Sequence, residues 1–361
     1  MSNSSDLSQR AHALPSRIAV LLTNLGTPQA ATASALRPYL RQFLSDPRVI
    51  EVPRLIWQII LNGVILVIRP RRSAQAYREI WTEQGSPLAV DTEALAHAVD
   101  KHLPEVKVDW AMRYGQPSIK KTMQSLLEDG YRRVFVLPLY PQYSATTTAS
   151  TFDAIADCLK ETRWIPDLRF NTAYHDQPEY LQAIADSIKA YWTEHGEPDK
   201  LLFSFHGIPQ SYFDKGDPYF CQCQRTVREV VERLDLDHSK YAIAFQSRVG
   251  KQVWLRPYTE DLLEQWGKEG IENVHVICPG FSIDCLETLE EIAIRGREDF
   301  IEAGGKTLSL IPCLNASDQH ANAIATIVQR QIKDWPVAEN QQVLDARIRR
   351  ADALQETLGK P

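Results

Sequence analysis

Short apolar runs alternate with amphipathic stretches along most of this chain, and each run has the length of one buried β-strand. In the first half these runs fall at 18–23, 106–112, 134–139 and 168–173. In the second half they fall at 201–205, 241–246, 274–277 and 307–311. Because helical patterns separate the runs, we expect parallel strands in each half.

The stretches between the strands repeat their apolar positions with helical spacing. Helices are expected at 32–44, 74–82, 91–102, 117–129, 179–194, 222–234, 259–267, 286–302 and 319–334. The pattern predicts an α/β protein with two similar halves, each with a four-stranded parallel sheet flanked by helices. The last helix is expected to pack back across both halves.

Glycine and proline residues that mark turns recur at similar positions in the two halves. The run Gly130 to Val136 returns as Gly270 to Val276, and Gly26-x-Pro28 returns as Gly207-x-Pro209. The two offsets differ by about 40 residues, the length of segment 48–87, which we interpret as an insertion in the first half. The alternative is a chance match between common glycine and proline turns. If the repeat is real, Leu25 is the counterpart of His206.

The repeat suggests five parts. We expect a disordered tail at 1–16 and a first α/β domain at 17–175. A second domain follows at 176–318, with the returning helix at 319–335 and a polar tail at 336–361. The domains are long enough to bury separate cores.

The most apolar segment, 55–68, is flanked by Arg54, Arg69, Arg71 and Arg72. It is too short to cross a bilayer, which takes about 20 helical residues. Its basic flanks suit either a contact with a membrane surface or the lip of a pocket for an apolar ligand. A buried core helix fits the pattern equally well.

Composition narrows the function classes. The 361 residues carry 40 basic and 46 acidic side chains, a formal net charge of −6, which argues against nucleic acid as a partner. The six cysteines form no C-x-x-C pair, so we expect free thiols in an intracellular protein. They are Cys158, Cys221, Cys223, Cys278, Cys285 and Cys313.

Candidate chemistry begins at His206, where the apolar strand 201–205 is broken by Gly207 and Pro209. This places the imidazole at the carboxyl edge of a sheet, where open α/β folds form ligand sites. The alternative is a histidine that only caps the strand.

A row of carboxylates follows the strand 274–277. If 286–302 is one helix, Glu287 and Glu291 share a face, with Asp284 one turn earlier. The alternative is a solvated helix start, which also favours acidic residues. An imidazole and carboxylates at one edge suggest a divalent metal, in an open site that suits a metal handed on as substrate.

Several ordered motifs resemble the ferrochelatase family from about residue 17 to 334. They include Ser204-Phe-His-Gly-Ile-Pro209, Gly216-Asp-Pro-Tyr219, Phe245-Gln-Ser-Arg-Val-Gly250 and Trp254-Leu-x-Pro257. Further matches are Asp284-x-x-Glu-Thr-Leu-x-Glu291, Asn24-Leu-Gly-x-Pro28, Gly85-Ser-Pro87, Arg113-Tyr114 and Tyr140-Pro-Gln-Tyr-Ser144. The resemblance implies two Rossmann-like domains of chelatase type. It also implies a lyase that inserts Fe²⁺ into protoporphyrin IX to give protoheme in the last step of heme biosynthesis.

The resemblance also assigns roles. His206 and Glu287 are implied as the catalytic residues and as metal ligands, with Asp284 and Glu291 continuing an acidic track. The porphyrin-binding residues implied are Leu25, Arg69, Tyr77, Ser86, Arg113, Tyr114 and Trp254. Segment 55–68 corresponds to an apolar lip, which implies peripheral contact with a membrane surface.

Departures from the family pattern refine this picture. Relatives with an iron–sulfur cluster have a cysteine where this chain has Ala145, and the C-terminal tail here contains none. We therefore expect no [2Fe-2S] cluster and no permanently bound cofactor, with Fe²⁺ only as substrate. Cys285 stands where some relatives have histidine, which leaves open a second soft ligand. A cytoplasmic protein is expected, at most peripheral at the inner face of the cell membrane.

Other functions remain open at this point. A coproporphyrin or cobalt chelatase of the same fold is one alternative, although Leu25 and the apolar lip favour a ring with few carboxylates. A heme-binding protein without turnover is another. Hydrolysis through Ser204 and His206 is the weakest, because no G-x-S-x-G turn is present.

Overall fold

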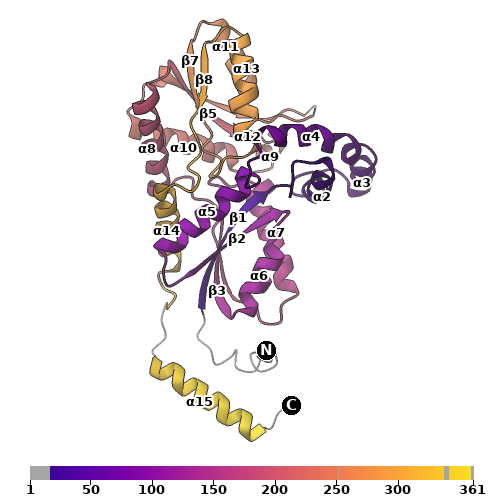
Figure 1. The fold of residues 1–361 in the computed structure, drawn as a ribbon, viewed down its shortest axis with the longest axis vertical. Coiled ribbons are helices and arrows are strands. Elements are labelled where there is room, and N and C mark those ends of the chain that lie inside the picture. The colour runs from indigo at the N-terminus through magenta and orange to yellow at the C-terminus, as the bar shows by residue number, and fades with distance from the viewer. Residues whose placement is uncertain (1–16, 251, 337–340, 359–361) are drawn as a thin grey trace.

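The computed structural model describes residues 17–250, 252–336 and 341–358 (Figure 1). It contains two four-stranded parallel sheets, with strand orders β2-β1-β3-β4 and β6-β5-β7-β8. The first sheet consists of β1 (Arg17–Gly26), β2 (Lys107–Tyr114), β3 (Tyr131–Pro138) and β4 (Asp167–Phe170). The second consists of β5 (Lys200–His206), β6 (Tyr241–Gln246), β7 (Asn273–Ile277) and β8 (Thr307–Leu310). The predicted fold class is confirmed.

Strand register supports the repeat between the halves. In the first sheet Ala19 lies opposite Val134, and in the second Lys200 lies opposite Val274. Counting along β1 and β5 from these pairs brings Leu25 level with His206. The two residues are therefore structural counterparts, and each lies at the carboxyl end of the central strand of its sheet.

Helices flank both sheets. Those of the first half are α2 (Ala33–Leu44), α3 (Arg54–Ile60), α4 (Leu66–Ile80), α5 (Pro87–His102), α6 (Ile119–Glu128) and α7 (Ser150–Lys160). Those of the second half are α8 (Pro178–His195), α9 (Gln210–Asp214), α10 (Tyr219–Leu234), α11 (Thr259–Lys268), α12 (Leu286–Leu289), α13 (Arg297–Glu302) and α14 (Asp318–Ile332). Helix α15 (Gln341–Leu358) lies in the polar tail, whereas the expected disordered tail 1–16 lies outside the described residues.

Local chemistry explains several helix ends. The Ser118 hydroxyl accepts a hydrogen bond from the backbone N–H of Lys121 at the start of α6, and Ser317 does the same for His320 at the start of α14. These contacts satisfy backbone donors that have no partner within the helix. Helix α8 ends at Gly196, whose φ of 79° lies in the left-handed region that glycine adopts without strain.

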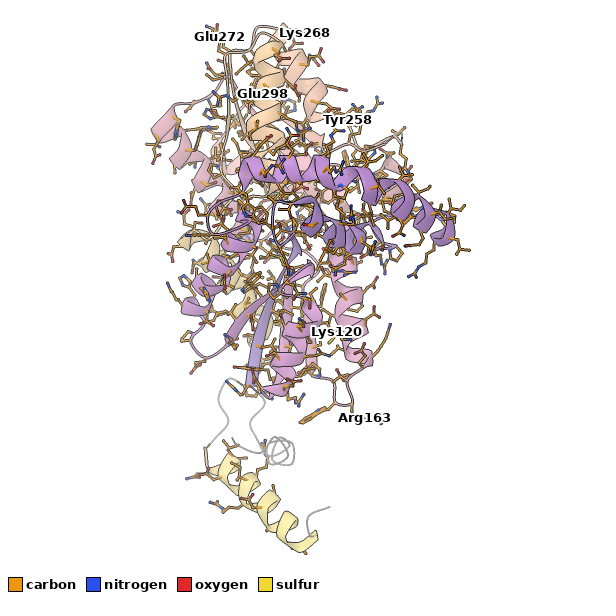
Figure 2. All side chains as sticks on the ribbon, turned by 45° about the vertical axis from the view of Figure 1, so that its right-hand side comes forward. Lys120, Arg163, Tyr258, Lys268, Glu272 and Glu298 are labelled. Carbon is orange, nitrogen blue, oxygen red and sulfur yellow. The ribbon has the colours of Figure 1, made fainter. Side chains whose placement is uncertain are left out.

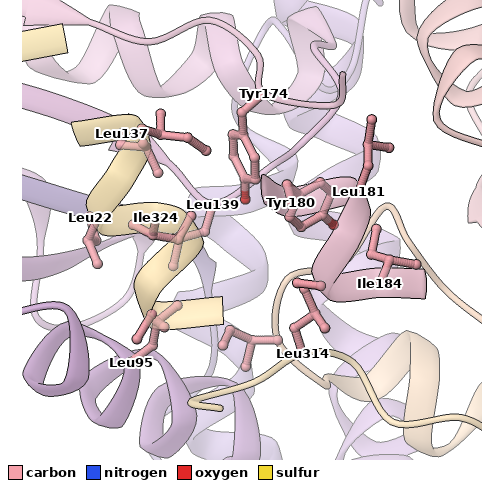
Figure 3. Close-up of a cluster of buried hydrophobic side chains, with 14 of the residues drawn as sticks. Leu22, Leu95, Leu137, Leu139, Tyr174, Tyr180, Leu181, Ile184, Leu314 and Ile324 are labelled. Atoms are coloured by element: carbon pink, nitrogen blue, oxygen red, sulfur yellow. The ribbon is translucent and has the colours of Figure 1, made fainter. Parts of the chain in front are cut away.

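One hydrophobic cluster joins the two halves. It contains Leu22 and Leu137 from the first sheet, Phe203 and Phe205 from β5, and Ile324 from α14. Figure 3 shows part of it, where side chains from α5, α8 and α14 meet. Because this apolar surface is removed from water only when the halves are together, the cluster stabilises their relative placement.

Helix α14 bridges the halves. It packs against α5 of the first half and against α8. Asp318 lies 3.1 Å from the His102 ring, and Arg330 forms an ion pair of 2.6 Å with Glu179. Its final turn is followed by Asp334, which pairs with Arg169 on β4.

Helices α2 to α4 form an arm that projects from the body of the molecule (Figures 1 and 2). Between α3 and α4 the chain makes a π-helical turn, η1 (Leu61–Ile65). The lip segment 55–68 lies on this arm. It exposes Leu55 by 84%, Ile59 by 75% and Ile68 by 66%, so the reading of the whole segment as a core helix is wrong. No helix among the described residues is long and apolar enough to span a membrane.

The stretch 286–302 is not one α-helix as predicted. Helix α12 ends at Leu289, and a π-helical turn, η4 (Glu291–Gly296), follows before α13 begins. A π turn adds one residue per turn, which changes the direction of every later side chain. Glu291 is the first residue of this turn, so the side chains whose direction changes relative to Glu287 are those that follow Glu291.

Candidate active site

His206 is the last residue of β5 and is partly buried. Its Nδ1 lies 2.6 Å from the carbonyl oxygen of Gly207, which can only accept a hydrogen bond. The hydrogen therefore sits on Nδ1, and Nε2 keeps a free lone pair. Such a nitrogen is suited to accept a proton or to bind a metal ion.

Close packing beyond His206 explains why the strand stops there. A Cβ at Gly207 would lie 3.0 Å from the carbonyl oxygen of Gln246 and 3.2 Å from the Trp254 ring. The indole N–H of Trp254 donates to the Val249 carbonyl at 3.0 Å, which fixes the ring beside Gly207. Trp254 thus supports the turn that carries His206.

Glu287 lies in the short helix α12, at the point where the second half touches the arm. Its neighbour Leu286 packs against an arm cluster that includes Leu25 and Tyr77. Burial raises the pKa of Tyr77, and the nearby Glu287 carboxylate raises it further. Burial lowers the pKa of Arg69, while Glu287 acts in the opposite direction. Arg69 and Tyr77 therefore both feel the charge of one carboxylate from the other half, and Leu25 packs in the same cluster as Tyr77.

The phenol of Tyr77 belongs to a small polar group. Its single O–H can donate to Tyr39 or to Thr27, and the Thr27 hydroxyl donates to Ser86 at 2.8 Å. Tyr39 in turn donates to the Gly26 carbonyl at 3.1 Å. Ser86 is 4% exposed, so its hydroxyl is buried against this group rather than facing solvent.

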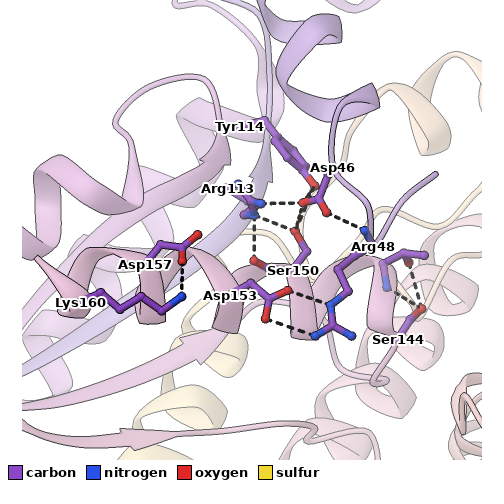
Figure 4. Close-up of polar contacts among 10 residues, drawn as sticks. Asp46, Arg48, Arg113, Tyr114, Ser144, Ser150, Asp153, Asp157 and Lys160 are labelled. Carbon is purple, nitrogen blue, oxygen red and sulfur yellow. Dashed lines mark hydrogen bonds and ion pairs between the residues drawn. The ribbon is translucent and has the colours of Figure 1, made fainter. Parts of the chain in front are cut away.

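Arg113 and Tyr114 point into a different network, at the base of the arm (Figure 4). Arg113 Nη2 donates to Asp46 Oδ2 at 2.6 Å, and the Tyr114 hydroxyl donates to the same oxygen at 2.8 Å. Ser150 donates to it as well, at 2.6 Å. Burial alone would raise the pKa of Asp46, but these hydrogen bonds, that of the Arg48 N–H and the Arg113 charge bring it below its usual value.

Glu291 opens the π-helical turn η4 and is held by Ser247, whose N–H and hydroxyl donate to its two oxygens at 2.7 and 2.6 Å. Burial raises the pKa of Glu291 and the Glu287 charge adds to the rise, whereas Ser247 and His206 oppose it. The charges of Glu291, Glu287 and His206 therefore influence one another. Glu291 also lines a small polar cavity of about 40 Å³ that includes Arg295 and Asp299.

Asp284 is separated from this group. It is 4% exposed, and both of its oxygens accept hydrogen bonds from the protein. Ser204 is also occupied, because its buried hydroxyl donates to Gln246 at 2.7 Å and contacts Thr259. It makes no pair with His206, so the hydrolase alternative lacks a nucleophile.

The cysteines are all free thiols. Cys285 is the residue that caps the start of α12, and burial raises the pKa of its thiol, with a further rise from Glu287. Cys221 is the exposed one, on α10. Within the described residues, no three His, Cys, Asp or Glu side chains are grouped closely enough to hold a metal ion.

Sequence reasoning missed Tyr39, Asp46 and Ser150. Tyr39 and Asp46 lie on and just after α2, and Ser150 is the first residue of α7. Nothing in their local sequence distinguishes them from ordinary helix residues. Only the packing of α2 against α4 and β2 brings them to Tyr77 and Arg113.

Solved structures place this fold. SirB from Bacillus subtilis with Fe³⁺ is similar with a TM-score of 0.53 at 11% sequence identity, over 87% of this chain and 95% of that one. At this identity the likeness concerns the fold alone. The two α/β halves of this chain therefore have the two-domain α/β chelatase fold.

The sequence carries the assignment further, since a family model described as ferrochelatase matches residues 17–332. The chain therefore belongs to the ferrochelatase family. A ferrochelatase of Idiomarina loihiensis is 48% identical over 350 residues, which cover 96% of this chain and 95% of the relative. One of Thioalkalivibrio sulfidiphilus is 50% identical over 347 residues, with coverage of 95% and 94%.

Membership confirms the predicted activity class. The chain is a lyase of heme synthesis that inserts iron into a porphyrin, with Fe²⁺ as substrate. The alternative of a heme-binding protein without turnover is not favoured.

Proposed function

We propose that this chain inserts Fe²⁺ into protoporphyrin IX held between its two halves, with His206 and Glu287 on one side of the ring. Two observations support the proposal: the charges of His206 and Glu287 both act on Glu291, and Leu286, beside Glu287, packs against the cluster of the first half that includes Leu25 and Tyr77. In this proposal the side chains of the first half suit the face of a planar apolar ring. The imidazole and carboxylates of the second half suit its central nitrogens.

His206 accepts the pyrrole protons in this proposal. Metal insertion releases two protons from the ring nitrogens, and a base must take them as the iron enters. The free lone pair on Nε2 supports this role, because Nδ1 already donates to the Gly207 carbonyl. The same nitrogen is also suited to bind the incoming iron before it reaches the ring.

Glu287 supplies negative charge beside the imidazole, and Glu291 continues the path away from the ring. A carboxylate near His206 stabilises the imidazolium that forms when a proton is accepted. The raised pKa of Glu291 supports it as the next acceptor, since a carboxylate with a higher pKa is a stronger proton acceptor than an ordinary one. Its cavity with Arg295 and Asp299 leads the path onward.

The porphyrin-binding residues divide by their contacts. Leu25 and Tyr77 are placed to contact the ring, and the partly buried guanidinium of Arg69 is suited to a propionate. Ser86 supports the polar group of Tyr77, Arg113 and Tyr114 hold Asp46 at the base of the arm, and Trp254 supports the turn that carries His206.

The lip segment favours protoporphyrin IX over a ring with more carboxylates. Leu55, Ile59 and Ile68 offer exposed apolar surface, which matches the vinyl and methyl edge of protoporphyrin. The exposed Arg54, Arg71 and Arg72 flank this surface and suit anionic lipid headgroups. We therefore place the enzyme in the cytoplasm, with the arm in peripheral contact with the inner face of the cell membrane.

The test is an anaerobic insertion assay. Initial rates are measured with protoporphyrin IX and coproporphyrin, each with Fe²⁺ and Co²⁺, and protoporphyrin with Fe²⁺ is expected to react fastest. His206→Ala is expected to lower kcat by about 100-fold or more, because a general base typically contributes that much. Glu287→Gln is expected to behave similarly.

Porphyrin binding, followed by fluorescence quenching, serves as the control, and both variants should still bind the ring. His238→Ala is a matched control, since that histidine lies in an exposed turn before β6. A clear preference for coproporphyrin would refute the substrate assignment. Near-normal turnover in His206→Ala would refute its role as the base.

A further inference from the structure

Helix α12 is too short to hold its own shape. It has four residues, Leu286–Leu289, and leads through Glu290 into the π-helical turn η4, so it makes few α-helical hydrogen bonds of its own. Glu287 is its second residue. The direction of this carboxylate therefore depends on contacts from outside the helix.

The first set of contacts comes from Asp284. Its Oδ1 accepts from the Thr288 hydroxyl at 2.7 Å, and its Oδ2 accepts from the Cys313 N–H at 3.2 Å. Thr288 also accepts from the Cys285 N–H at 3.0 Å. These bonds fasten the turn on both sides of Glu287.

Asn315, in the loop after β8, completes the arrangement. Its Nδ2 donates to Asp284 Oδ2 at 2.7 Å, and its Oδ1 accepts from the Asp284 N–H at 2.8 Å. One amide group thus holds both the side chain and the backbone of Asp284. Its own backbone N–H donates to the Ser282 carbonyl at 3.0 Å, which joins the loops that follow β7 and β8.

The backbone of Asn315 suits this position. Its φ of 46° lies in the left-handed region, which asparagine tolerates better than most residues. The buried His320 ring also fixes it, with Nδ1 2.6 Å from the Asn315 carbonyl oxygen. The loop is therefore held from α14, the helix that bridges the two halves.

We propose that Asn315 is a positioning residue for iron insertion, acting through Asp284 and Thr288 to fix the direction of the Glu287 carboxylate. Asp284 is then a support for α12 rather than a station for iron or protons, because its oxygens are already occupied by Thr288, Asn315 and the Cys313 N–H. This inference rests on the proposed role of Glu287.

A small displacement is enough to matter. Shifting a catalytic group by about 1 Å can cost about 100-fold in rate. The Glu287 backbone keeps one further contact, since Gln246 Nε2 donates to its carbonyl at 2.6 Å. Loss of the Asn315 amide is therefore expected to loosen α12 without releasing it, which lowers kcat by on the order of 10-fold.

The test uses Asn315→Gly in the full chain, because glycine keeps the left-handed backbone and removes only the amide. We expect kcat for Fe²⁺ insertion to fall about 10-fold, while the porphyrin Kd from fluorescence quenching changes less than about twofold. In the Glu287→Gln background the same change is expected to have no further effect, because the two residues act as one unit.

A matched control is Asp235→Gly, which replaces another left-handed residue, at the exposed end of α10, and should leave kcat unchanged. An equal 10-fold loss in the Glu287→Gln background would overturn the inference. If Glu287→Gln alone keeps normal turnover, the proposed role of Glu287 fails, and the inference fails with it. If only the double variant contradicts expectation, the role of Glu287 stands and that of Asn315 does not.

A second pair of variants covers a failure of Asn315→Gly to fold, as judged by circular dichroism. Thr288→Val removes the donor to Asp284 at nearly constant shape, whereas Thr288→Ser keeps the hydroxyl. We expect a fall in kcat for the valine variant and recovery in the serine variant. Equal activity in the two would refute the arrangement.

Discussion

In each half of the molecule a buried carboxylate organises its side of the site, Asp46 in the first and Asp284 in the second, and the two differ in the charge of their partners. Asp46 is 6% exposed and pairs with a guanidinium, that of Arg113, at 2.6 Å. Asp284 is 4% exposed and accepts only from neutral groups, those of Thr288, Asn315 and Cys313.

The difference follows from what each carboxylate supports. Asp46 anchors the base of an arm that exposes apolar side chains to solvent and needs a strong attachment to the first sheet. Asp284 supports a single helical turn next to His206 and Glu287. A guanidinium there would offset the negative charge of the carboxylates at the site where protons leave and a cation enters. The two halves thus share one topology, but the buried carboxylate of the first half holds the arm in place, whereas that of the second half supports the titratable residues His206 and Glu287.

The largest effect is expected for Asp46→Ala. The change leaves the Arg113 guanidinium without its partner in a mostly buried place, which typically costs about 3 kcal/mol in the free energy of unfolding. Urea unfolding at pH 7 measures the loss. The comparison predicts that porphyrin binding weakens with it, while the kcat of the remaining folded enzyme changes little.

The difference in stability between wild type and Asp46→Ala should change with pH in one direction. Because the pKa of Asp46 is lowered in the folded protein, its contribution is present above about pH 4 and is lost as the pH falls through its folded value. The gap between wild type and Asp46→Ala should therefore narrow in acid. Asp153→Asn is the control, since the Arg48–Asp153 pair is about half exposed and is worth less than about 1 kcal/mol. Equal losses in the two variants would contradict the importance of burial.

An intermediate effect of opposite sign is expected for Glu291→Gln. Its folded pKa is raised, so the protein loses stability as the pH rises from about 4, where an unfolded glutamate ionises, through the folded value. The glutamine variant should be more stable than wild type at pH 8, by on the order of 2 °C in Tm, and equal to it at pH 4. Differential scanning calorimetry measures both.

Glu298→Gln provides the comparison for this experiment, because Glu298 is exposed on α13 at the outer end of the second half (Figure 2). It should show no pH-dependent difference from wild type. A stability gain for Glu291→Gln that is the same at both pH values would mean that ionisation of Glu291 is not its cause.

The smallest effect on stability is expected on the arm. Val64 is 52% exposed, so Val64→Asp should change the free energy of unfolding by less than about 0.5 kcal/mol. It should nevertheless weaken binding to anionic phospholipid vesicles in a sedimentation assay, because a charge replaces apolar surface at the lipid contact. Val343→Asp, at a valine 55% exposed on α15, is the matched control. Equal binding by both variants would argue against a membrane contact through the arm.

Much of the fold was predictable because strands and helices differ in periodicity. The eight strands, their parallel arrangement and the two similar halves all follow from short apolar runs separated by amphipathic stretches. The position of His206 at a strand end follows from Gly207 and Pro209 directly behind it. The equivalence of Leu25 and His206 was also readable, since strand register preserves the spacing of the repeated turns.

Other features had no local signal. The apolar pattern of segment 55–68 fits a buried helix and an exposed lip equally well. Only the packing of the folded protein, which leaves this segment exposed, decides between them. The π-helical turn η4 inserts one residue between α12 and α13, which the carboxylate spacing alone does not reveal. Asp284 looked like one more member of an acidic row.

The sequence by itself determined the elements, their order, the family and the candidate residues His206, Glu287 and Glu291, because these depend on spacing along the chain. Only the tertiary structure decided that Asp284 turns inward to Asn315 and that Asp46 gathers Arg113, Tyr114 and Ser150. The physical reason is that the role of a carboxylate depends on which donors surround it. Those donors come from elements far apart in the chain, whose meeting is set by packing and not by local sequence.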